Sequence, residues 1–216
     1  MKFRIDLKIF LFALVFYFTK QIEIYSLVMF FAIIHEFGHL MVGLLLGMKP
    51  SKFELTPYGI GISFEITPKD YNYKIGKGNW LEVKKILVAL AGPMTNFVII
   101  LICFKLDIGF FSGLRVIYTN ILLIVFNLLP IYPLDGGRII KGILHIKFGK
   151  QKADKYINNL TLIVLILLTF ISSIAIYQLQ NISIFIINIF LWCLYIKEDR
   201  IYQKRKNIYE LLKEKY

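Results

Sequence analysis

The sequence predicts an all-α polytopic membrane protein with about six transmembrane helices and a small membrane-associated β-hairpin. Three observations favour this fold class. Of the 216 residues, 57% are hydrophobic and the mean hydropathy is +0.65, whereas soluble domains are usually about half apolar. Apolar runs that can cross a bilayer alternate with short basic segments. One stretch alternates apolar and polar residues on both sides of a turn.

The apolar runs define the expected domain organisation. Each run is bounded by charged residues or by a turn, and each is long enough, or nearly so, to span the hydrocarbon core. We assign residues 1–196 to one intramembrane domain and residues 197–216 to a basic cytoplasmic tail. The predicted spans are residues 5–19, 24–48, 86–104, 114–129, 160–177 and 182–196.

The charge distribution predicts the orientation of these spans. The chain carries 26 basic and 14 acidic residues, which gives a formal net charge of +12. With six spans, both termini lie on one side of the membrane, and 23 of the 26 basic residues fall on that side. The positive-inside rule therefore predicts that both termini are cytoplasmic. Because the basic residues lie where membrane topology requires them, we expect a lipid bilayer around the chain and no nucleic acid as a partner.

The second predicted span contains His35-Glu36-Phe37-Gly38-His39, an H-E-x-x-H motif. Residues four apart share a helix face, so both imidazoles can reach one zinc ion, and the glutamate beside them suits a general base. No other Asp, Glu, His, Lys or Arg lies in this span. A carboxylate near the middle of a bilayer costs about 2.5–3.5 kcal/mol on insertion scales, so we expect it to have a function. The alternative is a set of polar residues that pack against other spans.

A third metal ligand is expected where the fourth predicted span ends. Pro130 and Pro133 break the helix there, and Asp135 follows with two glycines that permit unusual backbone angles. A catalytic zinc site needs three protein ligands, and Asp135 is the best candidate for the third. Counting along a straight helix places Asp135 shallower than His39, so the prolines must fold the segment back. The alternatives for Asp135 are a helix N-cap or an ion-pair partner of Arg138.

The β-hairpin is predicted over residues 53–66. Apolar and polar residues alternate before and after a Pro-Tyr-Gly turn, and Ile60, Ile62 and Phe64 follow period two in the second strand. A free strand edge can hold an extended peptide through main-chain hydrogen bonds, so these residues are candidates for substrate binding. A structural flap is the alternative interpretation.

Asn96 is a further candidate for substrate binding, in the third predicted span. It follows a run of small residues that allow close helix approach, and it places an amide in an apolar helix. Such an amide can hold a peptide carbonyl or join two helices. The sequence leaves both interpretations open.

Taken together, these motifs resemble the site-2 protease family of intramembrane zinc metallopeptidases, also called peptidase family M50. The resemblance covers residues 24–138, and the motifs occur in the order of the family. It implies that His35, His39 and Asp135 bind one Zn²⁺, that Glu36 is catalytic and that Asn96 lies near the substrate. The motifs that carry it are His35-Glu36-Phe37-Gly38-His39, Ala91-Gly92-Pro93 with Asn96, Asn127-Leu128-Leu129-Pro130 and Leu134-Asp135-Gly136-Gly137.

The resemblance also implies partners. The wording of the last motif is most similar to the sporulation branch of the family, so a membrane-associated sigma-factor precursor is the expected substrate, with membrane-protein inhibitors or regulators as further partners. One alternative is a protease that cleaves a single-pass anti-sigma factor. Another is a catalytically idle homologue that only holds a client helix, but the complete set of His35, Glu36, His39 and Asp135 argues against it. An ion transporter is disfavoured because the sequence has no internal repeat.

Overall fold

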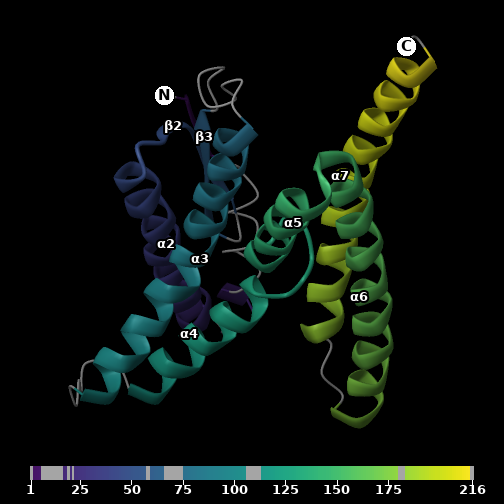
Figure 1. The fold of residues 1–216 in the computed structure, drawn as a ribbon. Helices are drawn as coiled ribbons and strands as arrows, with labels where there is room; N and C mark the ends of the chain where they lie inside the picture. The colour runs from purple at the N-terminus through teal and green to yellow at the C-terminus, as the bar shows by residue number, and fades with distance from the viewer. Residues whose placement is uncertain are drawn as a thin grey trace. The chain divides into compact units, whose positions relative to one another are not determined.

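The structure is a computed structural model that describes residues 2–5, 17–18, 20, 22–56, 59–65, 75–105, 113–179 and 183–214. The chain divides into two compact units, Met1–Asn127 and Leu128–Tyr216. Helices dominate both units, as the sequence predicts (Figure 1).

The first unit is built on three helices, α2 (Ile22–Leu45), α3 (Ile75–Lys105) and α4 (Gly113–Asn127). Helix α3 packs against both α2 and α4, and α2 also contacts α4. Phe31 and Ala32 of α2 form a small apolar cluster with Val116 and Leu123 of α4. Val116 and Leu123 are seven residues apart and therefore lie on the same face of α4.

A three-stranded sheet completes the first unit. Its strands are β1 (Lys2–Ile5), β2 (Lys49–Thr56) and β3 (Gly59–Glu65), in the order β1-β2-β3. Strands β2 and β3 form the predicted antiparallel hairpin, with Phe53 opposite Ile62 and Leu55 opposite Ile60. Strand β1 pairs with β2 in parallel, which the sequence did not predict. Among the described strands β3 has only β2 as a neighbour, and it packs against α2.

Two predicted boundaries in the first unit are wrong. Ile5, expected to begin the first span, is the last residue of β1, because its backbone pairs with Leu55. Residues 6–16 and 19 of that span lie outside the described residues. Helix α3 also begins at Ile75, eleven residues before the third predicted span. Residues 75–79 therefore extend α3 at its N-terminal end, before its apolar part.

The second unit consists of α5 (Asp135–Phe148), α6 (Lys150–Leu179) and α7 (Ser183–Glu214). Helix α6 packs against both α5 and α7, and α6 and α7 run antiparallel (Figure 1). Thr169 of α6 joins the long pair: its Oγ1 accepts hydrogen bonds of 3.0 Å from Nδ2 of Asn188 and from Nε1 of Trp192. Such polar contacts matter between apolar helices, because lipid offers no hydrophobic drive for their association.

Three of the described helical segments are long and apolar enough to cross a membrane. They are Ile22–Leu45, Asn79–Lys105 and Lys150–Gln178, and they contain most or all of the second, third and fifth predicted spans. The fourth predicted span corresponds to the apolar helix Gly113–Asn127, which has only 15 residues. The sixth lies inside α7, which continues without a break into the predicted tail. The described chain thus supports three of the six expected spans by length and composition.

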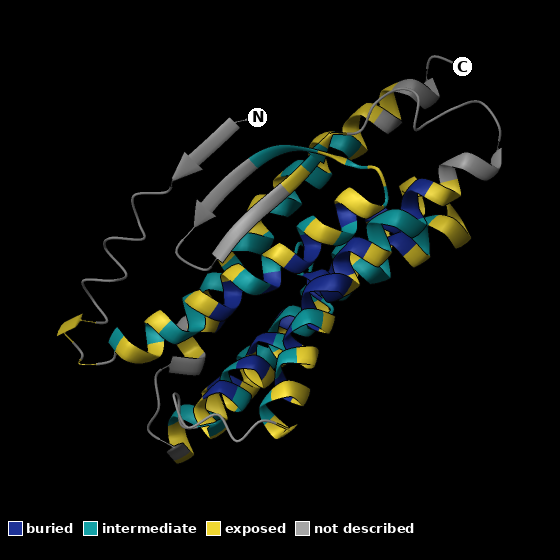
Figure 2. Cartoon of the chain, turned by 90° about the vertical axis from the view of Figure 1, so that its left-hand side faces the viewer, coloured by how far each residue is buried: buried dark blue, intermediate teal, exposed yellow. Residues whose placement is uncertain are grey.

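Many of the exposed residues of these helices, coloured yellow in Figure 2, are large and apolar, as lipid contact requires. On α2, Phe30, Ile33, Phe37 and Met41 are exposed, whereas His35 and His39 are buried. A helix that is apolar outside and carries its ionisable groups inside is typical of a membrane span with a functional interior.

Candidate metal centre

His35 and His39 lie one turn apart on α2 and share its buried face. Each side chain is 3% exposed, and the two ring centroids are 4.8 Å apart with an interplanar angle of 86°. The helix and the i, i+4 spacing agree with the prediction. Glu36, directly after His35, is half-buried. The motif therefore presents two neighbouring imidazoles inside the protein, with a carboxylate in the same turn.

The surroundings of His39 determine which ring nitrogen can bind a metal. Its Nδ1 lies 2.6 Å from the carbonyl oxygen of Val88, and a contact this short requires an N–H donor. The backbone nitrogen of Gly92 is 3.3 Å from the same Nδ1 but cannot donate to a protonated nitrogen, so the shorter contact decides the tautomer. The lone pair is then on Nε2. Metal-binding histidines commonly use their other ring nitrogen in this way.

Gly92 of α3 lies directly against both imidazoles. A Cβ atom at this position would collide with Nε2 of His35 and would lie 2.5 Å from both Cε1 and Nε2 of His39. Because Nε2 of both rings approaches the same glycine, the two nitrogens converge on one place. The space that a side chain would fill here is left to the imidazoles, and this favours a shared ligand for them.

Gly38 makes the reciprocal close approach from α2. A Cβ atom there would collide with the Thr95 side chain and would lie 3.0 Å from the carbonyl oxygen of Ala91. Thr95 in turn donates a 2.8 Å hydrogen bond to that carbonyl. Glycines on both helices thus hold α2 and α3 at close range. The small residues around Gly92 predicted a close helix approach, but not its relation to the motif.

The segment before Asp135 is a tight reversal. The N–H of Ile131 donates to the carbonyl of Leu129 at 2.7 Å, and the N–H of Leu134 donates to the carbonyl of Ile131 at 2.8 Å. The Tyr132-Pro133 peptide bond is cis. The two hydrogen bonds close tight turns between Leu129 and Leu134, directly before α5 begins.

The two glycines after Asp135 have a different role from the one predicted. Both are helical, and the described glycines with positive φ are Gly47 and Gly149 instead. A Cβ atom at Gly136 would collide with the carbonyl oxygen of Leu128, and one at Gly137 would lie 2.5 Å from the carbonyl group of Ile131. Glycine is required because the start of α5 lies against the backbone of its own preceding loop, not because of unusual backbone angles.

Asp135 is the first residue of α5 and is 4% exposed. The N-cap is Leu134, so the N-cap alternative for Asp135 is wrong. The ion-pair alternative has some support, since Nη1 of Arg138 lies 3.7 Å from Oδ1 of Asp135. That distance is long for a charge-assisted hydrogen bond, and the Arg138 side chain is 48% exposed.

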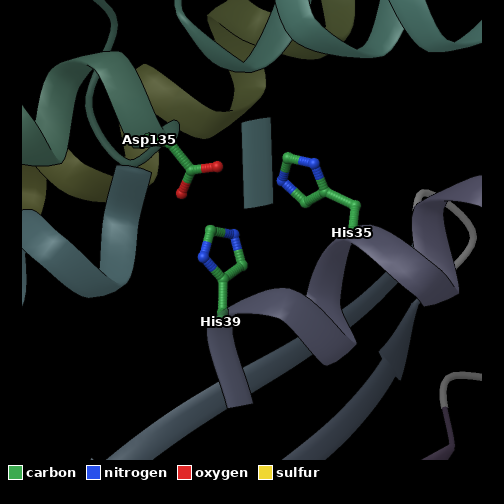
Figure 3. A group of neighbouring side chains, drawn as sticks. All are labelled: His35, His39 and Asp135. Atoms are coloured by element: carbon green, nitrogen blue, oxygen red, sulfur yellow. The ribbon is translucent and has the colours of Figure 1, made fainter. Parts of the chain in front are cut away.

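Within the described part of the chain, His35, His39 and Asp135 form a buried group that could hold a metal ion (Figure 3). Each offers one ligand atom, and these atoms lie within 4.8 Å of one another. Two imidazoles and one carboxylate are a donor set of catalytic zinc sites, which keep a fourth position open. The residues therefore fit zinc in number, type and burial.

Asn96 lies one turn beyond Gly92 on α3 and is fully buried. Among the described residues, neither its amide oxygen nor its amide nitrogen has a hydrogen-bond partner. A buried amide without a partner is costly. No described helix thus uses Asn96 as an anchor, which weighs against the helix-joining interpretation.

The hairpin residues are only partly described. Phe64 is half-buried on β3, and a Cβ atom at Gly43 of α2 would collide with its ring. Strand β3 therefore packs on the motif helix one turn beyond His39. Ile60 and Ile62 belong to β3 by their backbone, but their side chains lie outside the described residues.

Comparisons with known proteins are consistent with this site. The sequence model of Peptidase family M50 matches residues 107–172, which include Asp135 but not the histidines. A zinc metalloprotease of Methanocaldococcus jannaschii is 32% identical over 136 residues, or 59% of this chain. The chain covers 36% of that protein's length. The solved structure of a site-2 protease from the same organism shares the fold, with a TM-score of 0.61 and 21% identity over 90% of this chain and 88% of the other. The first two comparisons are thus with proteases, whereas the third shows a shared fold alone.

Proposed function

We propose that this chain is an intramembrane zinc metalloprotease of the site-2 protease type. The observation that carries the proposal is the convergence of the His35 and His39 Nε2 atoms at Gly92, in a buried group with Asp135. The match to Peptidase family M50 and the similarity to an archaeal zinc metalloprotease support it.

In this proposal His35, His39 and Asp135 hold one Zn²⁺. Bound zinc supplies a Lewis acid that lowers the pKa of water and polarises the scissile carbonyl. Glu36 takes a proton from the attacking water and delivers a proton to the leaving amine. The hydrogen bond from His39 Nδ1 to the Val88 carbonyl keeps the Nε2 lone pair directed at the metal.

Asn96 and strand β3 are the proposed substrate-binding groups. A helical substrate hides its scissile carbonyl in its own hydrogen bonds, so it must become extended before attack. The outer edge of β3, which carries Ile60, Ile62 and Phe64, can hold an extended segment through main-chain hydrogen bonds. Asn96 has buried amide groups to offer a peptide bond in the described part of α3.

The localisation that we propose is a multi-pass membrane protein with both termini cytoplasmic. Three apolar helices and the distribution of basic residues support it. A membrane-impermeant thiol reagent should label cysteines placed near either terminus only from the cytoplasmic side. Labelling of one end from the opposite side contradicts the assignment.

At the finer level, we propose the pro-segment of a membrane-associated sigma-factor precursor as the substrate. The sequence of the motif around Asp135 is most similar to that of stage IV sporulation protein FB, and the basic side of the protein can attract an acidic substrate. Membrane-protein inhibitors or regulators would then control access. A single-pass anti-sigma factor is the alternative substrate, and a catalytically idle client-binding homologue is the alternative function.

The test reconstitutes the full chain in proteoliposomes with either candidate substrate. We expect the wild type to shorten the sigma precursor, and Glu36→Gln to lose at least about 100-fold in rate while it keeps its zinc. Zinc is counted by mass spectrometry and product by gel. Cleavage confined to the anti-sigma span overturns the substrate proposal. Equal cleavage by Glu36→Gln, or none by the wild type, overturns the catalytic one.

A further inference from the structure

Helix α6 holds the Asp135 segment at two points, one on each side of Asp135. Before Asp135, the N–H of Tyr132 donates a 3.1 Å hydrogen bond to Oγ1 of Thr161. After Asp135, Nζ of Lys141 on α5 lies 2.7 Å from Oδ1 of Asp154. Both α6 residues are thus attached to the short stretch of chain that carries the carboxylate.

The two attachment points form one continuous face. Asp154 and Thr161 are seven residues apart, which places them on the same side of α6, and Ile157 lies between them. All three residues are at most 3% exposed. Lys141 Nζ also lies 4.2 Å from the centroid of the Tyr132 ring, so the two tethered elements contact each other. The turn before α5, helix α5 and helix α6 therefore contact one another near the start of α5.

This cluster is not a ligand site. The cavity beside it measures only about 20 Å³, enough for a single water molecule. A buried carboxylate is costly without compensating charge, and Asp154 has it twice. Besides Lys141, Arg205 of α7 places Nη1 3.6 Å from the other carboxylate oxygen. The charge of Asp154 is thus compensated by two cations of the protein, although neither contact has the geometry of a hydrogen bond. The Lys141 contact connects Asp154 to α5, the helix that begins with Asp135.

We propose that Thr161 and Asp154 are positioning residues that keep the carboxylate of Asp135 in the geometry needed to bind the metal. The inference rests on Asp135 being a zinc ligand, as proposed above. Thr161 fixes the loop that enters α5, and Asp154 fixes α5 itself through Lys141. Together, the two contacts with α6 fix the orientation of the backbone at Asp135, where the turn ends and α5 begins.

The test removes each tie without leaving a buried charge alone. Thr161→Val loses the hydroxyl acceptor at nearly constant volume. Lys141→Met releases α5 while Arg205 still faces Asp154. The matched controls are Thr169→Val and Arg205→Met. Thr169→Val removes an α6 hydroxyl that accepts hydrogen bonds from Asn188 and Trp192 of α7, and Arg205→Met removes the other cation beside Asp154. All are made in the full chain and purified in detergent.

Zinc affinity is measured by competition with a chromogenic chelator, and the ligand field by the visible spectrum of the Co²⁺-loaded protein. Substitution of residues that orient metal ligands typically lowers metal affinity by about tenfold or more. We therefore expect Thr161→Val and Lys141→Met each to lower zinc affinity about tenfold and to shift the visible absorption bands of bound Co²⁺. Thr161→Ser should restore both. The two controls should leave both unchanged.

Wild-type affinity and spectrum in Thr161→Val and Lys141→Met would overturn the positioning role. So would an equal loss of zinc in the controls, because it would reveal general destabilisation of the unit. Asp135→Ala separates this failure from failure of the proposed function. If that variant loses zinc while the tie variants do not, only the positioning role is wrong; if it keeps zinc, the ligand assignment itself is wrong.

Discussion

At the scale of single residues, the metal centre depends on contacts that exclude other side chains. His39 is oriented by the carbonyl of Val88, and both imidazoles lie against the Cα atom of Gly92. The buried face of α2 is thereby closed by backbone groups of α3. A helix that supplies only an N–H, a carbonyl and a hydrogen atom leaves room for the two rings, and a larger residue does not.

Gly92→Ala is therefore predicted to damage the metal centre. Its Cβ would collide with His35 and crowd His39, so the rings must leave their positions. We expect zinc affinity to fall at least about tenfold and stability to fall by about 1–3 kcal/mol from overpacking. Gly113→Ala is the control, because nothing lies within 4 Å of a Cβ there. Equal zinc affinity in both variants would show that the imidazoles tolerate displacement.

The ligand candidates were predictable from the sequence, whereas their surroundings were not. Residue type, spacing and an apolar context indicate the chemistry of four residues, His35, Glu36, His39 and Asp135. Gly92 was noted as part of a run of small residues and of one motif of the resemblance, but no contact with the histidines was predicted for it. Its contact with the rings depends on the register between α2 and α3, which local sequence does not specify.

At the scale of elements, strand β3 is coupled to the motif helix through a small contact. The ring of Phe64 occupies the space that a side chain at Gly43 would need, one turn beyond His39. This contact fixes the distance between the hairpin and the helix that carries the motif. If β3 holds the substrate, that distance decides how the extended segment is presented.

Gly43→Ala should weaken substrate binding without removing zinc. The added methyl group displaces the Phe64 ring and with it β3. We expect KM for the membrane substrate to rise several-fold, with an overpacking cost of about 1–3 kcal/mol. Phe64→Leu in the same chain makes room for the methyl group and should recover part of the loss. Unchanged KM in Gly43→Ala would argue that the hairpin is only a structural flap.

The elements themselves were predictable to different degrees. The hairpin followed from strict alternation around a turn, and α2 and α6 from long apolar runs. Strand β1 was missed because four residues carry little periodicity and their partner lies about fifty residues away. Helix α7 runs through the predicted boundary between domain and tail at residue 196, because helix hydrogen bonding continues when a helix changes from apolar to polar surroundings.

At the scale of the whole molecule, the proposed ligands come from both compact units. His35 and His39 belong to Met1–Asn127, and Asp135 belongs to Leu128–Tyr216. The proposed zinc ion would therefore bind residues that are about a hundred positions apart in the sequence. This joint ligand set is the central claim, since two imidazoles alone are too few for a catalytic zinc site.

The most direct test is the zinc content of purified Asp135→Ala beside Arg138→Ala. If Asp135 is a ligand, Asp135→Ala should lose zinc affinity by at least about 10- to 100-fold. Arg138→Ala removes the ion-pair partner, 3.7 Å away, and should keep about one zinc per chain. The account is contradicted if Asp135→Ala retains full zinc, or if both variants lose it alike, since Asp135 would then serve only as the partner of Arg138.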